Sequence, residues 1–84
     1  MKTKHRKTLA AIFAKPTRSN IKFSDIESLI KALGGEVREG AGSRVVLELS
    51  GTREYTHRPH PGKDAKKYVV EEIRDWLTGL GVMP

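Results

Sequence analysis

Residues 36–57 read EVREGAGSRVVLELSGTREYTH and contain three short segments separated by two turns. In the middle segment, residues 44–49, apolar and polar side chains alternate as they do in a strand with one buried face. The Ser50–Gly51 pair is a hairpin signal, and the GAGS segment before it is typical of a turn. The pattern therefore predicts a three-stranded antiparallel sheet, with strands at residues 36–39, 44–49 and 52–57.

The register of the second hairpin determines which side chains share a face, and the sequence leaves two registers open. A two-residue turn pairs Arg44 with His57 and places Leu47 opposite Glu54. A three-residue loop pairs Leu47 with Tyr55 instead. Tyr55 is then a core residue, whereas in the first register it faces solvent and can stack on a base.

Helical periodicity is present on both sides of these strands. Before them, residues 24–35 carry an apolar stripe, with Ser24 and Glu27 at the spacing of a capping box. After them, residues 64–82 carry a second stripe, which Asp64 can cap. We interpret the aromatic side chains of the last helix as packing groups; they are Tyr68 and Trp76.

The chain before residue 24 predicts a further amphipathic helix, which Pro16 ends. The order helix, helix, three strands, helix is typical of an α+β domain with its helices on one face of an antiparallel sheet. We expect residues 1–84 to form a single domain, comprising a basic helical extension over residues 1–21 and a core over residues 22–82.

Positive charge is concentrated at the start of the chain. Through Lys22 the sequence contains seven of its 16 Lys and Arg residues and none of its 10 acidic residues, so the net charge of +6 arises there. Such asymmetry favours an anionic partner, and nucleic acid more often than membrane. The alternative is a basic helix face that is merely solvated.

The composition excludes several classes of site. The chain has no cysteine, which excludes disulfides, thiolate metal ligands and a cysteine nucleophile, and which fits a reducing cytoplasm. No apolar run approaches the roughly 18 residues of a membrane span. The apolar run near the N-terminus is shorter than a signal-peptide core. We therefore expect a cytoplasmic protein without a membrane segment.

Residues 55–63, YTHRPHPGK, are the strongest candidate for a chemical site. RNA can be cleaved without metal when a base takes the 2′-hydroxyl proton and an acid protonates the leaving 5′-oxygen, and histidine suits both roles. We interpret His57 and His60 as proton carriers. The candidate phosphate clamps are Arg44, Arg58 and Lys63. The alternative is a stiff proline loop whose histidines face water.

A metal site is the weaker interpretation of the same segment. His57 and His60 supply two nitrogen ligands, whereas most metal sites need three or four ligands. We expect no metal and no cofactor.

Three stretches of the chain are informative together: DIESLIKALGGEVREGAGSRVVLEL at residues 25–49, HRPHPGK at residues 57–63 and IRDWLTGLGV at residues 73–82. In this order they resemble the HicA family of toxins, which act in toxin–antitoxin pairs. The resemblance covers roughly residues 22–82. It implies a fold like the double-stranded-RNA-binding domain and the activity of an mRNA interferase, a hydrolase that cleaves mRNA. It also implies a HicB-type antitoxin that covers the site.

One position departs from the family pattern. The family carries a histidine at or very near the position after the Gly-Ser that opens the second strand, whereas here Ser43 is followed by Arg44. An arginine side chain stays protonated at neutral pH and cannot act as a general base, although it can clamp a phosphate. The family's second histidine is matched by His60, which precedes Pro61. The chain thus resembles a branch with a basic N-terminal extension and without the first histidine.

The other charged segments keep several interpretations. Three interpretations of the first helix stay open: it binds RNA phosphates, it docks the antitoxin or a second copy of the chain as a homodimer, or it simply packs its apolar side on the other helices. Its candidate phosphate ligands are Lys4, Arg6 and Lys7. The turn that ends at Ser43 offers backbone N–H groups to a phosphate. For the whole chain, a non-catalytic RNA-binding module and a protein–protein interaction domain remain alternatives to the nuclease.

Overall fold

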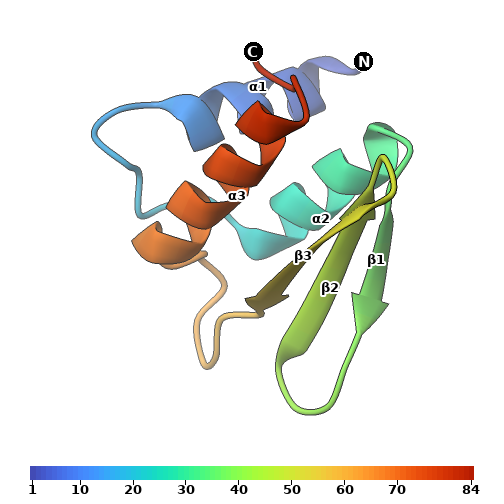
Figure 1. Cartoon of the computed structure of the whole chain (residues 1–84). Helices are drawn as coiled ribbons and strands as arrows, with labels where there is room; N and C mark the ends of the chain where they lie inside the picture. The colour runs from blue at the N-terminus through green and yellow to red at the C-terminus, as the bar shows by residue number, and fades with distance from the viewer.

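A computed structural model describes all 84 residues and contains three helices and one three-stranded sheet (Figure 1). The elements are α1 (Thr3–Phe13), α2 (Phe23–Ala32), β1 (Glu36–Glu39), β2 (Arg44–Leu49), β3 (Thr52–His57) and α3 (Lys67–Gly79). The sheet is antiparallel in the order β1-β2-β3. This confirms the predicted α+β fold, with an α-β-β-β-α core preceded by an extra helix. None of the three helices has the length and apolar character required to span a membrane.

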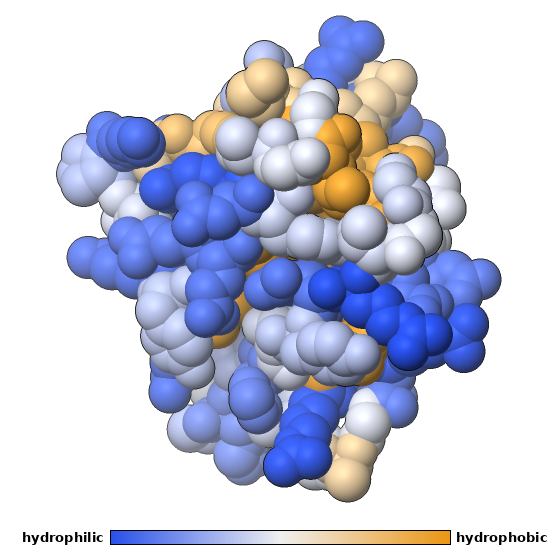
Figure 2. Space-filling view, in the orientation of Figure 1, coloured by the Kyte–Doolittle hydropathy of each residue, from blue (hydrophilic) through white to orange (hydrophobic).

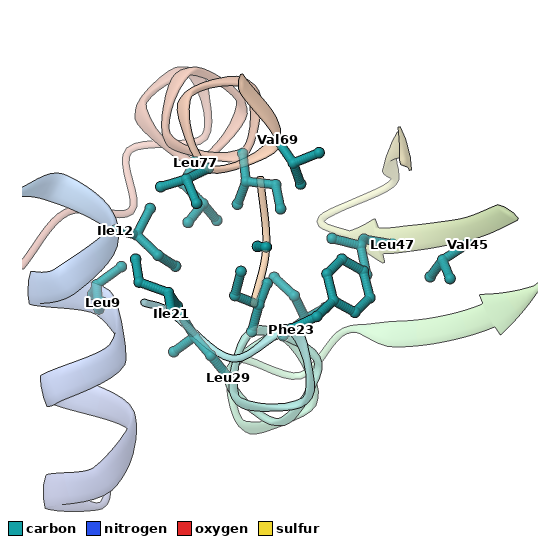
Figure 3. Close-up of a cluster of buried hydrophobic side chains, with 14 of the residues drawn as sticks. Leu9, Ile12, Ile21, Phe23, Leu29, Val45, Leu47, Val69 and Leu77 are labelled. Carbon is teal, nitrogen blue, oxygen red and sulfur yellow. The ribbon is translucent and has the colours of Figure 1, made fainter. Parts of the chain in front are cut away.

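The helices lie on one face of the sheet in two tiers. Helix α2 contacts β1 and β2, and α3 contacts β3, whereas α1 contacts α2 and α3 but no strand. A single cluster of 15 buried apolar side chains fills the space between these elements (Figure 3). Leu9 and Ile12 of α1 belong to this cluster, together with Phe23 of α2 and Leu47 of β2. The first helix therefore packs on the outer side of the helical layer and contributes to the same core.

The turn at Ser50–Gly51 has two residues and fixes the register that the sequence left open. Both residues have positive φ, 53° for Ser50 and 74° for Gly51, as a type I′ hairpin turn requires. In the resulting register Arg44 faces His57 and Val46 faces Tyr55. The two-residue alternative is therefore the one that forms.

This register has one unfavourable consequence, which is the position of Glu54. It pairs with buried Leu47 on the face of the sheet that the helices cover. Burial raises the pKa of the Glu54 carboxyl, and the nearby charge of Glu72 raises it further. The two-residue turn therefore places Glu54 on the covered face, although a carboxylate is more stable in water.

Two predicted helix caps are wrong. Helix α2 begins at Phe23, one residue before the expected cap Ser24, and no side chain caps it. The backbone N–H of Phe23 instead donates to the carbonyl oxygen of Lys63 at 3.0 Å. Helix α3 begins at Lys67, three residues after the expected cap Asp64, and it also lacks a side-chain cap. At the start of α2, a tertiary hydrogen bond therefore takes the place of the local cap that the sequence pattern predicts.

Candidate functional site

The solvent face of the sheet carries Arg44, Tyr55 and His57. Side chains alternate along the strands, and the opposite face holds the buried residues Val45 and Leu47. Arg44 and His57 are directly paired across β2 and β3, and both are exposed. Tyr55 is 67% exposed, so it faces solvent and not the core. The structure thus places these three predicted site residues on one open surface.

The two predicted catalytic histidines line the same hollow. This histidine hollow has a volume of about 280 Å³, and its polar lining comprises Ser43, His57, Arg58, His60, Lys66 and Tyr68. The backbone N–H of Arg58 donates to the carbonyl oxygen of Ser43 at 2.8 Å. This bond holds the turn between β1 and β2 against the loop that follows β3. Groups from both loops, and from the start of α3, are therefore brought together.

Sequence reasoning missed Lys66 and Tyr68 as members of this group. Tyr68 was expected to pack, but it is 52% exposed and lines the histidine hollow. The sequence feature that indicates this exposure is the position of Tyr68 directly before Val69, the first buried residue of the last helix. Trp76 is half-buried, and its indole N–H donates to the Thr52 hydroxyl at 2.9 Å, as a packing residue with a polar edge does.

Arg58 reaches toward the helical layer, away from the open face. Its guanidinium forms ion pairs with Glu27 of α2 and Glu39 of β1. These hydrogen bonds, with Glu27 first, raise the pKa of Arg58. Arg58 is therefore held by two carboxylates, although it was predicted as a phosphate clamp.

Lys63 lies outside the histidine hollow. It lines a neighbouring hollow of about 440 Å³ with Lys22, Ser24 and Glu27, beside the start of α2. We call this the Lys63 hollow. Arg58 and Pro59 line both hollows, so the two depressions adjoin.

The predicted phosphate ligands of the first helix are divided by the structure. Lys4 and Lys7 line a third hollow between α1 and the segment that leads to α2, whereas Arg6 does not line it. The Lys4 ammonium lies 4.0 Å from the carboxylate of Asp25. Lys7 forms no ion pair.

Charge on the open face of the sheet is balanced at one end only. Glu48 accepts ion pairs from Arg38 and Arg53, each at 2.7 Å, and Arg38 also pairs with Glu36. The hydrogen bond from Arg38, followed by the charges of both arginines, lowers the pKa of Glu48. Arg44, at the other end, has no acidic partner. The free positive charge of this face therefore lies beside His57.

The surface near the histidine hollow is hydrophilic. In Figure 2 the apolar colour gathers mainly in the upper part, where α1 and the C-terminal end of α3 lie in Figure 1. The lower part, which contains the loops at the far end of the sheet, is mainly hydrophilic. No group of three or more His, Asp or Glu side chains is arranged to hold a metal ion. The arrangement offers two imidazoles, unpaired cations and exposed aromatic rings to a polar ligand.

Comparison with known proteins identifies a family for most of this arrangement. The chain matches the family described as "HicA toxin of bacterial toxin-antitoxin" over residues 23–81. The match covers more than half of the chain and includes every element from α2 to α3, so α1 lies outside it. No significant match was found among curated proteins or among solved structures.

Proposed function

Because the chain belongs to the HicA toxin family of bacterial toxin–antitoxin systems, we propose that it is a metal-independent endoribonuclease that cleaves mRNA. Because its substrate is mRNA, it acts in the cytoplasm. A HicB-type antitoxin neutralises it by covering the cleavage site.

The observation that carries this proposal is the shared hollow of His57 and His60. Two histidines line one depression of about 280 Å³, so both can act on one phosphodiester. The cation of Arg44 is the cross-strand neighbour of His57, and Lys66 lines the hollow itself. A base, an acid and positive charge are the groups that metal-free RNA cleavage needs.

The reaction that these groups support is an internal transesterification. One neutral imidazole takes the proton of a ribose 2′-hydroxyl, and the 2′-oxygen attacks the adjacent phosphorus. The P–O bond to the 5′-oxygen breaks, and the second imidazole, in its protonated form, gives its proton to that oxygen. The products are a 2′,3′-cyclic phosphate and a free 5′-hydroxyl. Histidine supplies both forms near neutral pH because its ordinary pKa is about 6.5.

Arg44 and the exposed tyrosines serve binding in this scheme. The Arg44 guanidinium stabilises the negative charge that develops on the phosphate oxygens, and the backbone of Ser43 contacts the same phosphate. Tyr55 and Tyr68 stack on the bases that flank the cleaved bond. Their exposure, at 67% and 52%, leaves both rings accessible.

Incubation of the purified protein with mRNA in EDTA tests the nuclease. We expect cleavage, and we expect His57→Ala or His60→Ala to reduce its rate by at least about 100-fold, as loss of a general acid or base does. His5→Gln is the matched control, because His5 is the third histidine of the chain and lies in α1, outside the hollow. Cleavage that survives both alanine substitutions, or that needs a divalent ion, contradicts the proposal.

A second candidate function is a non-catalytic RNA-binding module on the same fold. The observation that favours it is Arg44, which occupies the place after Gly-Ser where the family is expected to carry a histidine. Tight, salt-dependent binding of RNA that stays intact identifies the module. An absence of RNA binding excludes both functions and leaves a protein–protein interaction domain.

A further inference from the structure

A further hollow lies along the N-terminal extension. It has a volume of about 540 Å³ and lies between α1 and the segment that joins α1 to α2. Its polar lining is basic, with Asp25 as the one acid; the cations are Lys4, Lys7, Arg18 and Lys22. We call this the α1 hollow. Lys7, Arg18 and Lys22 form no ion pair with any carboxylate of the chain.

These unpaired cations do not stabilise the fold. Like charges that face one hollow repel one another, so their grouping costs folding free energy unless an anion is bound. The one carboxylate in the hollow, Asp25, lies at 4.0 Å from Lys4 and leaves the other three cations free. The hollow therefore has the charge of a site for phosphate groups.

The α1 hollow and the histidine hollow are linked through residues that line adjoining hollows. Lys22 lines both the α1 hollow and the Lys63 hollow, and the latter shares Arg58 and Pro59 with the histidine hollow. The backbone brings the same segments together, because Ala65 donates a hydrogen bond to Ile21 at 2.8 Å and Lys22 forms a β-bridge with Asp64. Figure 1 shows the segment after α1 descending beside the first turn of α3.

We propose that these three hollows form one track for single-stranded RNA, which leads from the two histidines to the basic N-terminal extension. The ligand identity rests on the proposed function, whereas the α1 part of the track lies outside the matched family segment. Free cations occur at each step; from the histidine end they are Lys66, Lys63, Lys22, Arg18 and Lys7. The carboxylate of Glu27, which lies beside the track, is neutralised by Arg58.

The features at the histidine end favour a single strand over a duplex. Tyr55 and Tyr68 are exposed, and aromatic rings stack on bases only when those bases are unpaired. A positively charged groove combined with stacking aromatic rings is the usual arrangement in proteins that bind single strands. The track extends the contact with the strand beyond the nucleotides at the cleaved bond.

The test is RNA binding as a function of salt, measured by fluorescence anisotropy on the full chain. The variant is Lys7→Ala with Arg18→Ala, and its matched control is Lys2→Ala with Lys31→Ala. Each pair removes two positive charges, and Lys2 and Lys31 are exposed residues that line none of the three hollows. Single-stranded RNAs of about 12 and about 3 nucleotides serve as probes, with a duplex of the longer sequence as a third probe.

For the longer strand, we expect the slope of log K against log salt to fall by about 1.4 in the Lys7/Arg18 variant, since each phosphate contact to a single strand contributes about 0.7. The control should keep the original slope, and the short RNA should bind both variants alike. Equal losses in both variants overturn the track, because they reflect net charge alone. Tighter binding of the duplex than of the single strand also overturns it.

The outcome separates the track from the nuclease. A protein that does not cleave RNA but shows the Lys7/Arg18 dependence disproves the nuclease and keeps the track. If the protein cleaves RNA but binds the longer strand equally well without Lys7 and Arg18, the track is disproved. The cations of the α1 hollow then serve to bind a protein partner.

Discussion

Arg58 has side-chain contacts that its position in the sequence does not reveal. It lies between the two histidines in the chain, and its positive charge made it a candidate phosphate ligand. Its guanidinium instead joins Glu27 and Glu39, and its backbone N–H binds Ser43. The residue therefore holds the loop that carries His60 against α2 and β1.

We predict that Arg58→Ala lowers the free energy of unfolding by about 1–2 kcal/mol, between the values for exposed and buried ion pairs. The reason is that Glu27, whose side chain is only 16% exposed, loses its partner. Urea denaturation measures the change. Lys63→Ala, which removes an exposed cation of the same loop, should change stability by less than about 0.5 kcal/mol. Unchanged stability in Arg58→Ala, together with a lower salt slope for RNA binding, would show that Arg58 contacts phosphate after all.

The candidate site was predictable only in part at this scale. His57 and His60 are three residues apart in one loop, so their proximity follows from the chain itself. The ion pair of Arg58 with Glu27 does not follow from the chain in this way, because Glu27 is 31 residues away in another element. Tyr68 was missed because helical periodicity separates buried from exposed positions but does not show which loop an exposed side chain faces.

At the scale of elements, the strands were predicted fully and the helix starts were not. The alternation of residues 44–49 and the turn residues fix the strand limits locally. The choice between two registers came from Ser50–Gly51, whose positive φ angles suit a two-residue turn. Helix α2 begins at Phe23 because the side chain of this residue is buried and its backbone N–H donates a hydrogen bond to Lys63. Local capping patterns contain no information on such contacts.

The connection between α2 and β1 depends on the absence of a side chain at Gly35. A Cβ atom there would lie 2.2 Å from the carbonyl oxygen of Glu48 and 2.8 Å from a methyl carbon of Ile30. We predict that Gly35→Ala destabilises the protein by about 2–3 kcal/mol, since an overpacked site must shift backbone. Thermal unfolding followed by circular dichroism measures this loss.

Gly62→Ala provides the control for this substitution, because a Cβ atom at Gly62 meets nothing within 4 Å. It should unfold within a few degrees of the parent protein. Similar losses in the two variants would mean that the close approach of α2 to β2 does not limit stability.

For the whole molecule, the main question is whether the extension folds with the rest. The family match leaves out α1, yet Leu9 and Ile12 are buried in the common core. The side chain of Arg74 in α3 donates to the carbonyl oxygens of Ile12 at 2.8 Å and Ala14 at 3.2 Å, which satisfies groups at the end of α1. A chain of 84 residues has a small core, so these contacts are a substantial part of it. We infer that residues 1–84 form one cooperative unit.

Ile12→Ala tests this unit, because Ile12 is fully buried between α1 and the other helices. We predict a loss of about 3 kcal/mol, typical of a large-to-small change in a core, and one urea transition with an unchanged slope. Arg6→Ala, on the exposed side of the same helix, should leave the midpoint within about 0.5 kcal/mol of the original. A separate early transition in Ile12→Ala would mean that α1 detaches alone. The cations of the α1 hollow would then lose their fixed positions, while the histidine hollow would stay intact. Weaker binding of long RNA, without loss of the core fold, would therefore accompany the early transition.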